Sequence, residues 1–416
     1  ETGLVERNGV IRLEGGQNAK VSVNGNLSAT GNLAGSKGGT IEVTGEQVAL
    51  FKNASLDASG DVGGGTVLVG GDLQGKNVQV YNARTTFVAQ GATIDVSAKQ
   101  NGNGGKAIVW ADSATRYYGN ILATGGANNG NGGFAEVSGK QYLDFSGKAD
   151  LSAMNGLAGN LLLDPLNITL TTVDANTTGF TPPGDITQAF TDDAGSTSTF
   201  NVNAGGSFAG IAAGSTITLQ ATNNITVSTA FNVATATGSA NNSLVLQANN
   251  NIAVNAAVST TGTGSITMQA DADNSGAGTL ALGANNLSSQ TGGITLSGAS
   301  ITKTTGTIVS TGAAGTSGGN INITSTSTAN LGTGAITANG GAGAAASAGG
   351  NAGNVTITAA GAITTGAVTA TGGAAGAGNA AGGNAGFINI STTAGTITTG
   401  TLTASTGAAT GMGAGG

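Results

Sequence analysis

The chain has 416 residues, of which 76 are glycine, 8 % are charged and 4 % are aromatic, and its net charge is −7. It has no cysteine and no histidine, which argues against thiol, zinc and imidazole chemistry. Residues 1–150 hold 12 of the 13 basic side chains and balance at −1, whereas residues 151–416 balance at −6, so the basic stripe that nucleic acid requires is missing.

Residues 1–160 contain Gly-Gly pairs that each precede a short aliphatic strand. The four copies begin at Gly38, Gly64, Gly104 and Gly132. One strand with its turn is too small to bury a core, so repetition at this interval indicates a solenoid whose coils cover one another. We attribute the glycines to turns, where a positive φ is tolerated. We therefore predict a β-helix over residues 1–160.

Residues 161–215 interrupt the repeat and are predicted to form a junction with an extruded loop. A strand at Leu161–Leu163 ends at Asp164-Pro165, where Asp164 is expected to cap a turn. The segment also holds Pro182-Pro183, a predicted helical turn near Thr187–Phe190, and four phenylalanines that could cover the edge of a core: Phe180, Phe190, Phe200 and Phe208.

Residues 216–416 show period-2 triplets separated by Gly, Ala, Asn and Thr. The triplet that begins at Ile321 recurs at Val355 and again at Ile388; a second series steps from Ile336 to Val368 and Leu402. We predict stacked parallel coils of roughly 20–25 residues, about 4.8 Å apart, with Gly340–Gly353 and Gly372–Gly386 extruded as loops. The repeats are expected to continue beyond this sequence.

Few residues suggest catalysis or metal binding. Asp192-Asp193 and the pair Asp271/Asp273 are the only close carboxylates, and glycoside hydrolysis needs two that face each other across a groove. The segment 271–276 faintly resembles a calcium loop, but its twelfth position is Leu282, so an Asx turn is favoured. No catalytic, cofactor or metal residue is predicted.

Aromatic, Thr and Asn side chains suggest three less favoured roles, which are sugar stacking, ice binding and glycosylation. Trp110, Tyr117 and Tyr118 could stack on a sugar, but packing on the surface between coils is favoured. A flat Thr-x-Thr face could bind ice, although regular two-column spacing is not expected. Hydrogen-bonded ladders are favoured over glycosylation at the Asn-x-Ser/Thr sites, which include Asn53, Asn167, Asn224, Asn322, Asn354 and Asn389.

Three segments together resemble the filamentous haemagglutinin-type exoproteins of Gram-negative bacteria, which are surface adhesins secreted by the two-partner route. They are Gly104–Ala111 with Tyr118–Ile121, Gly132–Lys140 and Leu161–Thr169. The resemblance implies a right-handed parallel β-helix, an outer-membrane partner transporter and display at the cell surface. The family's N-terminal secretion domain, with its Asn-Pro-Asn-type motif, is not in this sequence, which favours an internal fragment.

The expected fold is therefore an all-β, right-handed parallel β-helix with Gly/Ala-rich loops extruded from its coils. The expected function is that of an extracellular, non-enzymatic adhesin or fibre, with domains at 1–160, 161–215 and 216–416. Its partners would be a glycan or protein receptor on a host cell or surface, or other copies of itself in a filament. The alternative is a β-helical polysaccharide lyase or hydrolase. No run of 18 apolar residues predicts a transmembrane helix.

Overall fold

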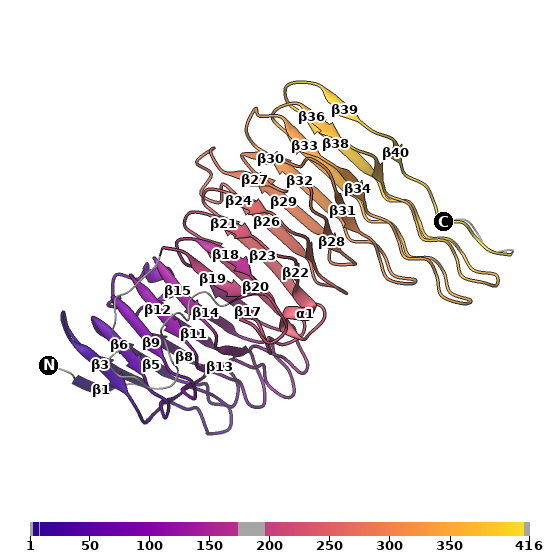
Figure 1. The fold of residues 1–416 in the computed structure, drawn as a ribbon. Coiled ribbons are helices and arrows are strands. Elements are labelled where there is room, and N and C mark those ends of the chain that lie inside the picture. Colours follow the sequence, from indigo (N-terminus) through magenta and orange to yellow (C-terminus); the bar gives the residue numbers. More distant parts are fainter. Residues whose placement is uncertain (1–2, 8, 174–195, 412–416) are drawn as a thin grey trace. The chain divides into compact units, whose positions relative to one another are not determined.

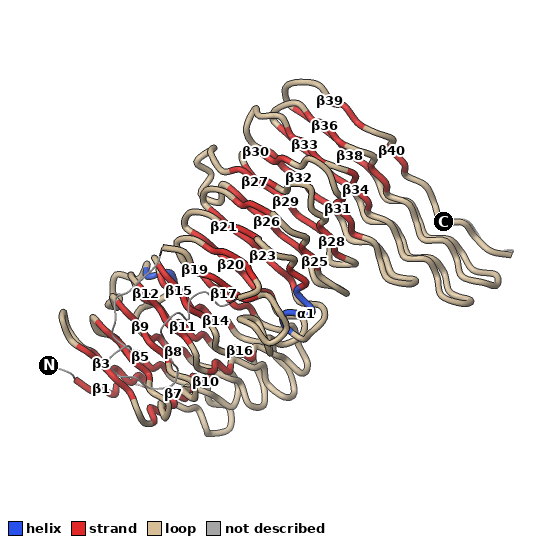
Figure 2. The backbone as a smooth tube through the Cα atoms, in the orientation of Figure 1, coloured by secondary structure: helices blue, strands red, loops and turns tan. Residues whose placement is uncertain are grey.

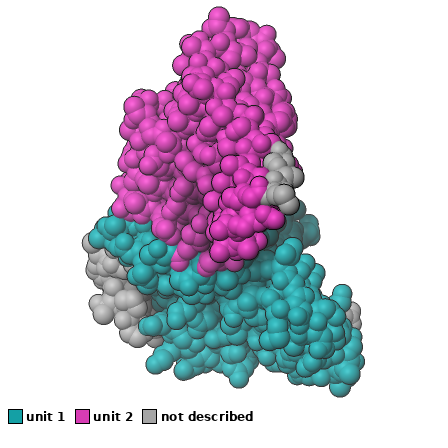
Figure 3. Space-filling view, turned by 90° about the vertical axis from the view of Figure 1, so that its right-hand side faces the viewer, with its two compact units in different colours: residues 1–222, 235–239 teal, residues 223–234, 240–416 magenta. Residues whose placement is uncertain are grey.

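A computed structural model describes residues 3–7, 9–173 and 196–411 of the chain. Nearly every element in these residues is a strand (Figures 1 and 2), and the two helices are short, η1 (Leu73–Gly75) and α1 (Val233–Thr237). Two compact units are present (Figure 3), residues 1–222 with 235–239 (unit 1) and residues 223–234 with 240–416 (unit 2). The predicted all-β parallel β-helix is confirmed.

Unit 1 is built from coils of three strands, and each strand pairs with its counterpart in the next coil. The first sheet contains β1 (Gly3–Arg7), β2 (Val10–Glu14), β5 (Thr40–Thr44), β8 (Thr66–Val69), β11 (Lys106–Ala111), β14 (Phe134–Gly139), β17 (Asn160–Leu163) and β20 (Thr216–Ala221). The second sheet contains β3 (Lys20–Val23), β6 (Gln47–Leu50), β9 (Thr85–Val88), β12 (Ala114–Tyr117) and β15 (Tyr142–Phe145). The third sheet contains β4 (Asn26–Ser28), β7 (Ser55–Asp57), β10 (Thr93–Asp95), β13 (Asn120–Leu122) and β16 (Lys148–Asp150). A further parallel pair is β18 (Ile168–Thr171) with β19 (Ser198–Asn201), and β1 is antiparallel to β2.

Unit 2 repeats the three-strand coil. Its first sheet contains β23 (Ser243–Ala248), β26 (Ile266–Ala270), β29 (Ile294–Gly298), β32 (Ile321–Ser325), β35 (Val355–Ala359) and β38 (Ile388–Thr392). The second position in the coil is taken by β21 (Ile225–Val227), β24 (Ile252–Val254), β27 (Thr279–Ala281), β30 (Ser300–Thr302), β33 (Leu331–Thr333), β36 (Ile363–Thr365) and β39 (Ile397–Thr399). The third is taken by β22 (Phe231–Asn232), β25 (Val258–Ser259), β28 (Leu287–Ser289), β31 (Thr307–Ser310), β34 (Ala335–Thr337), β37 (Val368–Thr369) and β40 (Leu402–Thr403).

The register follows the sequence repeats. Ile321 pairs with Val355 and Val355 with Ile388, while Ile336 pairs with Val368 and Val368 with Leu402. In the first sheet of unit 2, the number of residues from one paired residue to the next is smallest between Leu244 and Ile266. It is larger in every later coil of that sheet. Most coils are thus longer than the sequence predicts, because their connecting segments are extended.

The alternation of side chains places the core inside each coil. In β32 the aliphatic Ile321 and Ile323 are buried, whereas Asn322 and Thr324 face solvent. Strands of the first sheet in unit 1, such as β11 and β14, are instead buried over nearly their whole length. Their outer face is therefore also covered, which the sequence did not indicate.

The second glycine of each Gly-Gly pair lies where two coils come too close for a side chain. A Cβ added at Gly105 would lie 2.0 Å from the carbonyl oxygen of Gly65, and one at Gly65 would lie 2.0 Å from that of Gly39. The φ of these three residues is not in the left-handed region. Close backbone approach, rather than the positive φ expected from the sequence, requires glycine here.

The Gly/Ala-rich segments of unit 2 run out from the coils and back as ordered layers, side by side in Figure 1. Residues 339–353 bond to residues 371–386 at every third position, through Gly343 N to Ala374 O (2.7 Å) and Ala346 N to Ala377 O (2.8 Å). Gly350 N donates to Gly341 O (2.8 Å), which ties the returning arm to the outgoing one. A spacing of three is the period of a polyproline II helix, and glycine permits such chains to pack closely.

Two of the junction phenylalanines have the predicted covering role. Phe200 and Phe208 are fully buried, with ring centroids 6.0 Å apart. Phe180, Phe190, Pro182-Pro183 and the helical turn at Thr187–Phe190 lie outside the described residues.

Candidate functional site

A loop between β8 and β9 covers the outer face of the first sheet in unit 1. More residues separate Thr66 from its paired residue Lys106 than separate Thr40 from Thr66 or Lys106 from Phe134. The coil between Thr66 and Lys106 therefore carries an insertion. We call residues 72–82 the strap. It includes η1, where Gln74 adopts a left-handed φ of 53°.

The strap lies over an apolar patch formed by Leu68, Ile108 and Trp110, against which Val80 and Phe134 also pack. The indole of Trp110 is 3 % exposed. A Cβ added at Gly75 would lie 2.7 Å from the indole Nε1, so the strap backbone rests directly on the ring. The indole also donates to Asp112 Oδ1 (3.1 Å), which accepts from Asn82 at the end of the strap (3.3 Å).

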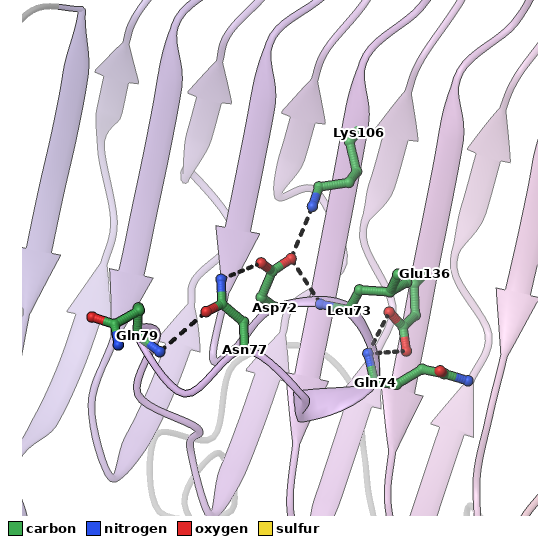
Figure 4. A network of polar contacts seen from close by, with 7 residues as sticks. All are labelled: Asp72, Leu73, Gln74, Asn77, Gln79, Lys106 and Glu136. Atoms are coloured by element: carbon green, nitrogen blue, oxygen red, sulfur yellow. Dashed lines mark hydrogen bonds and ion pairs between the residues drawn. The ribbon is translucent and has the colours of Figure 1, made fainter.

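Gln74 fastens the strap to successive coils. Its backbone N–H donates to both carboxylate oxygens of Glu136, at 3.1 and 3.2 Å, as Figure 4 shows. Its side-chain amide donates to Asp164 Oδ2 and to Gln220 Oε1, both at 3.1 Å. The backbone and side chain of this one strap residue thus reach β14, the end of β17 and β20.

Asp72 anchors the start of the strap. Its carboxylate accepts from Lys106 Nζ on β11 (2.9 Å), from Asn77 (2.8 Å) and from the backbone N–H of Leu73 (2.8 Å) (Figure 4). These hydrogen bonds lower the pKa of Asp72 against a desolvation that opposes them.

Glu136 and Asp164 are carboxyl groups removed from water. Glu136 is fully buried, and desolvation raises its pKa to about 7, opposed by the Gln74 N–H. Asp164 is 7 % exposed, and desolvation raises its pKa to about 6, opposed by the hydrogen bond from Gln74. Among the described residues Asp164 Oδ1 has no hydrogen-bond partner. The pair can therefore bind and release protons near neutral pH.

This raised proton affinity predicts a pH-dependent stability. The pKa values of Glu136 and Asp164 are higher in the folded than in the unfolded chain. Their contribution to the free energy of unfolding is therefore fully present below about pH 4 and is lost as the pH rises through 6–7. We expect the free energy of unfolding to fall between pH 5 and pH 8, by roughly 3 kcal/mol from Glu136. Urea titrations at both pH values test this, and Glu136→Gln should flatten the dependence; an equally steep dependence in that variant would contradict the assignment.

A second covered cluster lies on the outer face of the second sheet. Ala49, Phe87, Ala89 and Tyr118 pack together. The hydroxyl of Tyr118 donates to Asp144 Oδ2 at 2.6 Å. Desolvation raises the pKa of Tyr118, and the Asp144 carboxylate raises it further. This contact buries both polar groups, since Tyr118 is 8 % and Asp144 2 % exposed.

Several residues singled out in the sequence have other roles. Asp164 does not cap a turn; it faces the strap. Trp110 and Tyr118 pack on the outside of the coils as predicted, but the prediction for Tyr117 is wrong, because it lies inside, stacked on Phe145 with centroids 5.6 Å apart. Asp192-Asp193 lies outside the described residues.

The segment at Asp271 is the turn that the sequence favoured. Asp271 Oδ1 accepts from Ser275 Oγ and from the backbone N–H of Gly276, both at 2.9 Å, and these bonds lower the pKa of Asp271. Among the described residues no group of three or more His, Cys, Asp or Glu side chains could hold a metal ion.

Glu136 and Gln74 were not singled out from the sequence. One signal for Glu136 was available, since it occupies an outward position within the apolar strand β14. Gln74 gave no comparable signal, because its partners are distant in the sequence, on β14, after β17 and on β20.

Unit 2 carries a different feature, two columns of uncharged polar side chains on the outer face of its first sheet. We call them the polar columns. They are Thr267, Thr295, Asn322, Thr356 and Asn389, and Gln269, Ser297, Thr324, Thr358 and Ser391, aligned by the parallel register. The two positions stay aligned from coil to coil, but only β35 has Thr at both of them, so a regular Thr-x-Thr face is not sustained, as the sequence indicated.

Asparagine ladders connect the coils at their corners. Asn354 N–H donates to Asn320 Oδ1 (2.8 Å), and Phe387 N–H donates to Asn354 Oδ1 (3.0 Å). Asn224 Oδ1 accepts in the same way from Asn251 N–H. Ladder bonding is confirmed for the sequon residues Asn224 and Asn354, while Asn167 donates to Ser196 O.

The chain matches no protein-family model and no curated protein sequence. Across the residues that the structure describes, no helix is long and apolar enough to cross a membrane.

Proposed function

We propose that this chain is a secreted, cell-surface structural or adhesive β-helical protein whose polar columns bind an uncharged, hydroxyl-rich polymer such as a neutral glycan. The regular presentation of the columns carries the proposal. Parallel pairing holds their side chains about 4.8 Å apart from coil to coil, and residues i and i+2 on a strand about 6.6 Å apart. Hydroxyl and amide groups in such an array both donate and accept hydrogen bonds.

Charge supports an uncharged ligand. Residues 274–416 contain a single charged side chain, Lys303, which is 7 % exposed and donates to the backbone oxygen of Asn285. A surface of this kind has no counterions to release, so binding through it should vary little with salt.

The test is binding to immobilised neutral glycans and to cells, measured with and without added salt. Thr324→Lys places a charge in the middle of the columns and should weaken binding about tenfold or more, roughly 1.4 kcal/mol. Thr364→Lys is the matched control, because Thr364 is exposed on β36, away from the columns. Equal binding by the two variants would overturn the assignment of the face.

Extracellular export through an outer-membrane partner transporter is part of the proposal and rests on the resemblance to filamentous haemagglutinin-type exoproteins. Secretion of the chain only in the presence of a co-encoded outer-membrane transporter would support it. Self-assembly is a further part, since open strand edges can pair with another copy. A light-scattering mass that does not change with concentration would count against filaments.

Polysaccharide cleavage is the alternative, favoured only by the two carboxyl groups of raised pKa, Glu136 and Asp164. Glu136 is buried beneath the strap, so a substrate could reach it only after the strap moves. Release of reducing or unsaturated ends from a glycan panel, lost in Asp164→Asn, would establish this activity in place of adhesion.

A further inference from the structure

Two neighbouring carboxyl groups in unit 1 share one partner, the strap residue Gln74. Its backbone N–H bonds Glu136 and its side-chain amide bonds Asp164. The backbone N–H of Asp164 donates to Ser138 Oγ on β14 (3.1 Å), which places Asp164 beside the strand that carries Glu136. Burial disfavours the ionised form of both groups, and the charge of Asp164 raises the pKa of Glu136 further.

The charged groups around the pair offset its charge only in part. Lys106 on β11 is engaged with Asp72 (2.9 Å). Lys76 on the strap donates to Gln74 Oε1 (2.7 Å), and its charge lowers the pKa of Asp164 by less than desolvation raises it. Asp72 and Asp112 add further negative charge at the two ends of the strap. Neither Glu136 nor Asp164 has a described ion pair.

We propose that Glu136 and Asp164 form a proton-binding site that controls the strap, which is closed when protons are bound and lifts from the sheet when both carboxyl groups are ionised. The hydrogen bond from the Gln74 N–H favours ionised Glu136 and so favours the closed strap at high pH. Desolvation, which favours protonated Glu136, is the larger effect. Since lifting the strap would return both groups to water and restore their ordinary pKa values, closing takes up protons. The closed form is therefore favoured below about pH 6 and weakened above about pH 7.

Lifting the strap would uncover the apolar patch of Leu68, Ile108 and Trp110. The site thus couples the protonation of two buried carboxyl groups to the exposure of an aromatic surface. This inference does not depend on the ligand of the polar columns, which belong to unit 2.

Trp110 is the single tryptophan of the chain and reports directly on the strap. In the full chain we expect acrylamide quenching of its fluorescence to increase several-fold, with a red shift of emission, between pH 5 and pH 8. Glu136→Gln should keep the protected, blue-shifted emission over the whole range, because its amide does not ionise. If Glu136→Gln does not fold, Asp164→Asn provides the same test. It should at least halve the increase in quenching between pH 5 and pH 8.

Glu42→Gln is the matched control, since Glu42 projects from β5 on the same face and pairs with Arg12 (2.8 Å). It should retain the wild-type transition. Quenching of the wild type that is constant from pH 5 to pH 8, or an unchanged transition in both Glu136→Gln and Asp164→Asn, would overturn the proposal. Circular dichroism at each pH separates lifting of the strap, which leaves the β spectrum intact, from global unfolding, which does not.

Discussion

Gly105→Ala is expected to prevent folding or to lower the free energy of unfolding by roughly 3 kcal/mol or more. The new methyl carbon would lie 2.0 Å from the carbonyl oxygen of Gly65 and 2.8 Å from the carbonyl carbon of Gly64. Both obstacles are backbone atoms held in the sheet, so no rotamer change relieves the overlap. Only separation of two coils does, and that lengthens the bond from Lys106 N–H to Gly65 O.

Gly16→Ala is the control for this prediction. Gly16 is exposed, and a Cβ there would meet nothing within 4 Å. Its free energy of unfolding should change by less than about 0.5 kcal/mol. Urea titrations followed by circular dichroism compare the two variants, and equal stabilities would show that the coils are not packed as closely as the structure has them.

Phe145→Ala is expected to cost about 3–5 kcal/mol. Phe145 lies inside the coils of unit 1, where it is 1 % exposed and stacks on Tyr117 at an interplanar angle of 11°. Its removal leaves a cavity lined by neighbouring coils, whose backbone hydrogen bonds restrain collapse. The hydroxyl of buried Tyr117, which has no hydrogen-bond partner in the described part of the chain, already carries a desolvation cost that the variant does not relieve.

Phe387→Ala tests whether the loss comes from burial rather than from residue type. Phe387 is 55 % exposed and contributes its backbone N–H to an asparagine ladder, which alanine preserves. We expect a change below about 1 kcal/mol. Thermal or urea unfolding of both variants gives the comparison, and a larger loss for Phe387→Ala would contradict the assigned interior.

The repeats of unit 2 were predictable because each coil repeats its local pattern. The alternation in Ile321–Ile323 and its recurrence at Val355 and Ile388 specify which side chains face inward and which strands pair. The Gly/Ala segments were expected as extruded loops, but their bonding at every third residue was not. That order arises from contacts between neighbouring arms, which no single segment reveals.

The candidate site was not predictable in the same way. The sequence predicts a turn role for Asp164 and a surface position for Tyr117, and both predictions are wrong. Each concerns orientation next to a bend or strand end, where the period-2 rule no longer decides which way a side chain points. In the sequence, the strap has the composition of an ordinary Gly- and Asn-containing loop. Only the structure shows its contacts with β11, β14 and the end of β17.

By itself, the sequence determined that short strands stack in parallel coils. It also determined the positions of the recurring glycine pairs and the aliphatic residues that fill the interior. It could do so because strand periodicity and repeat length are local properties. Only the tertiary structure decided that the outer face of the first sheet in unit 1 is covered, that Gln74 joins Glu136 to Asp164, and that the polar columns of unit 2 align. Those features depend on which coils become neighbours, since burial and the pKa of a carboxyl group are set by groups distant in the chain.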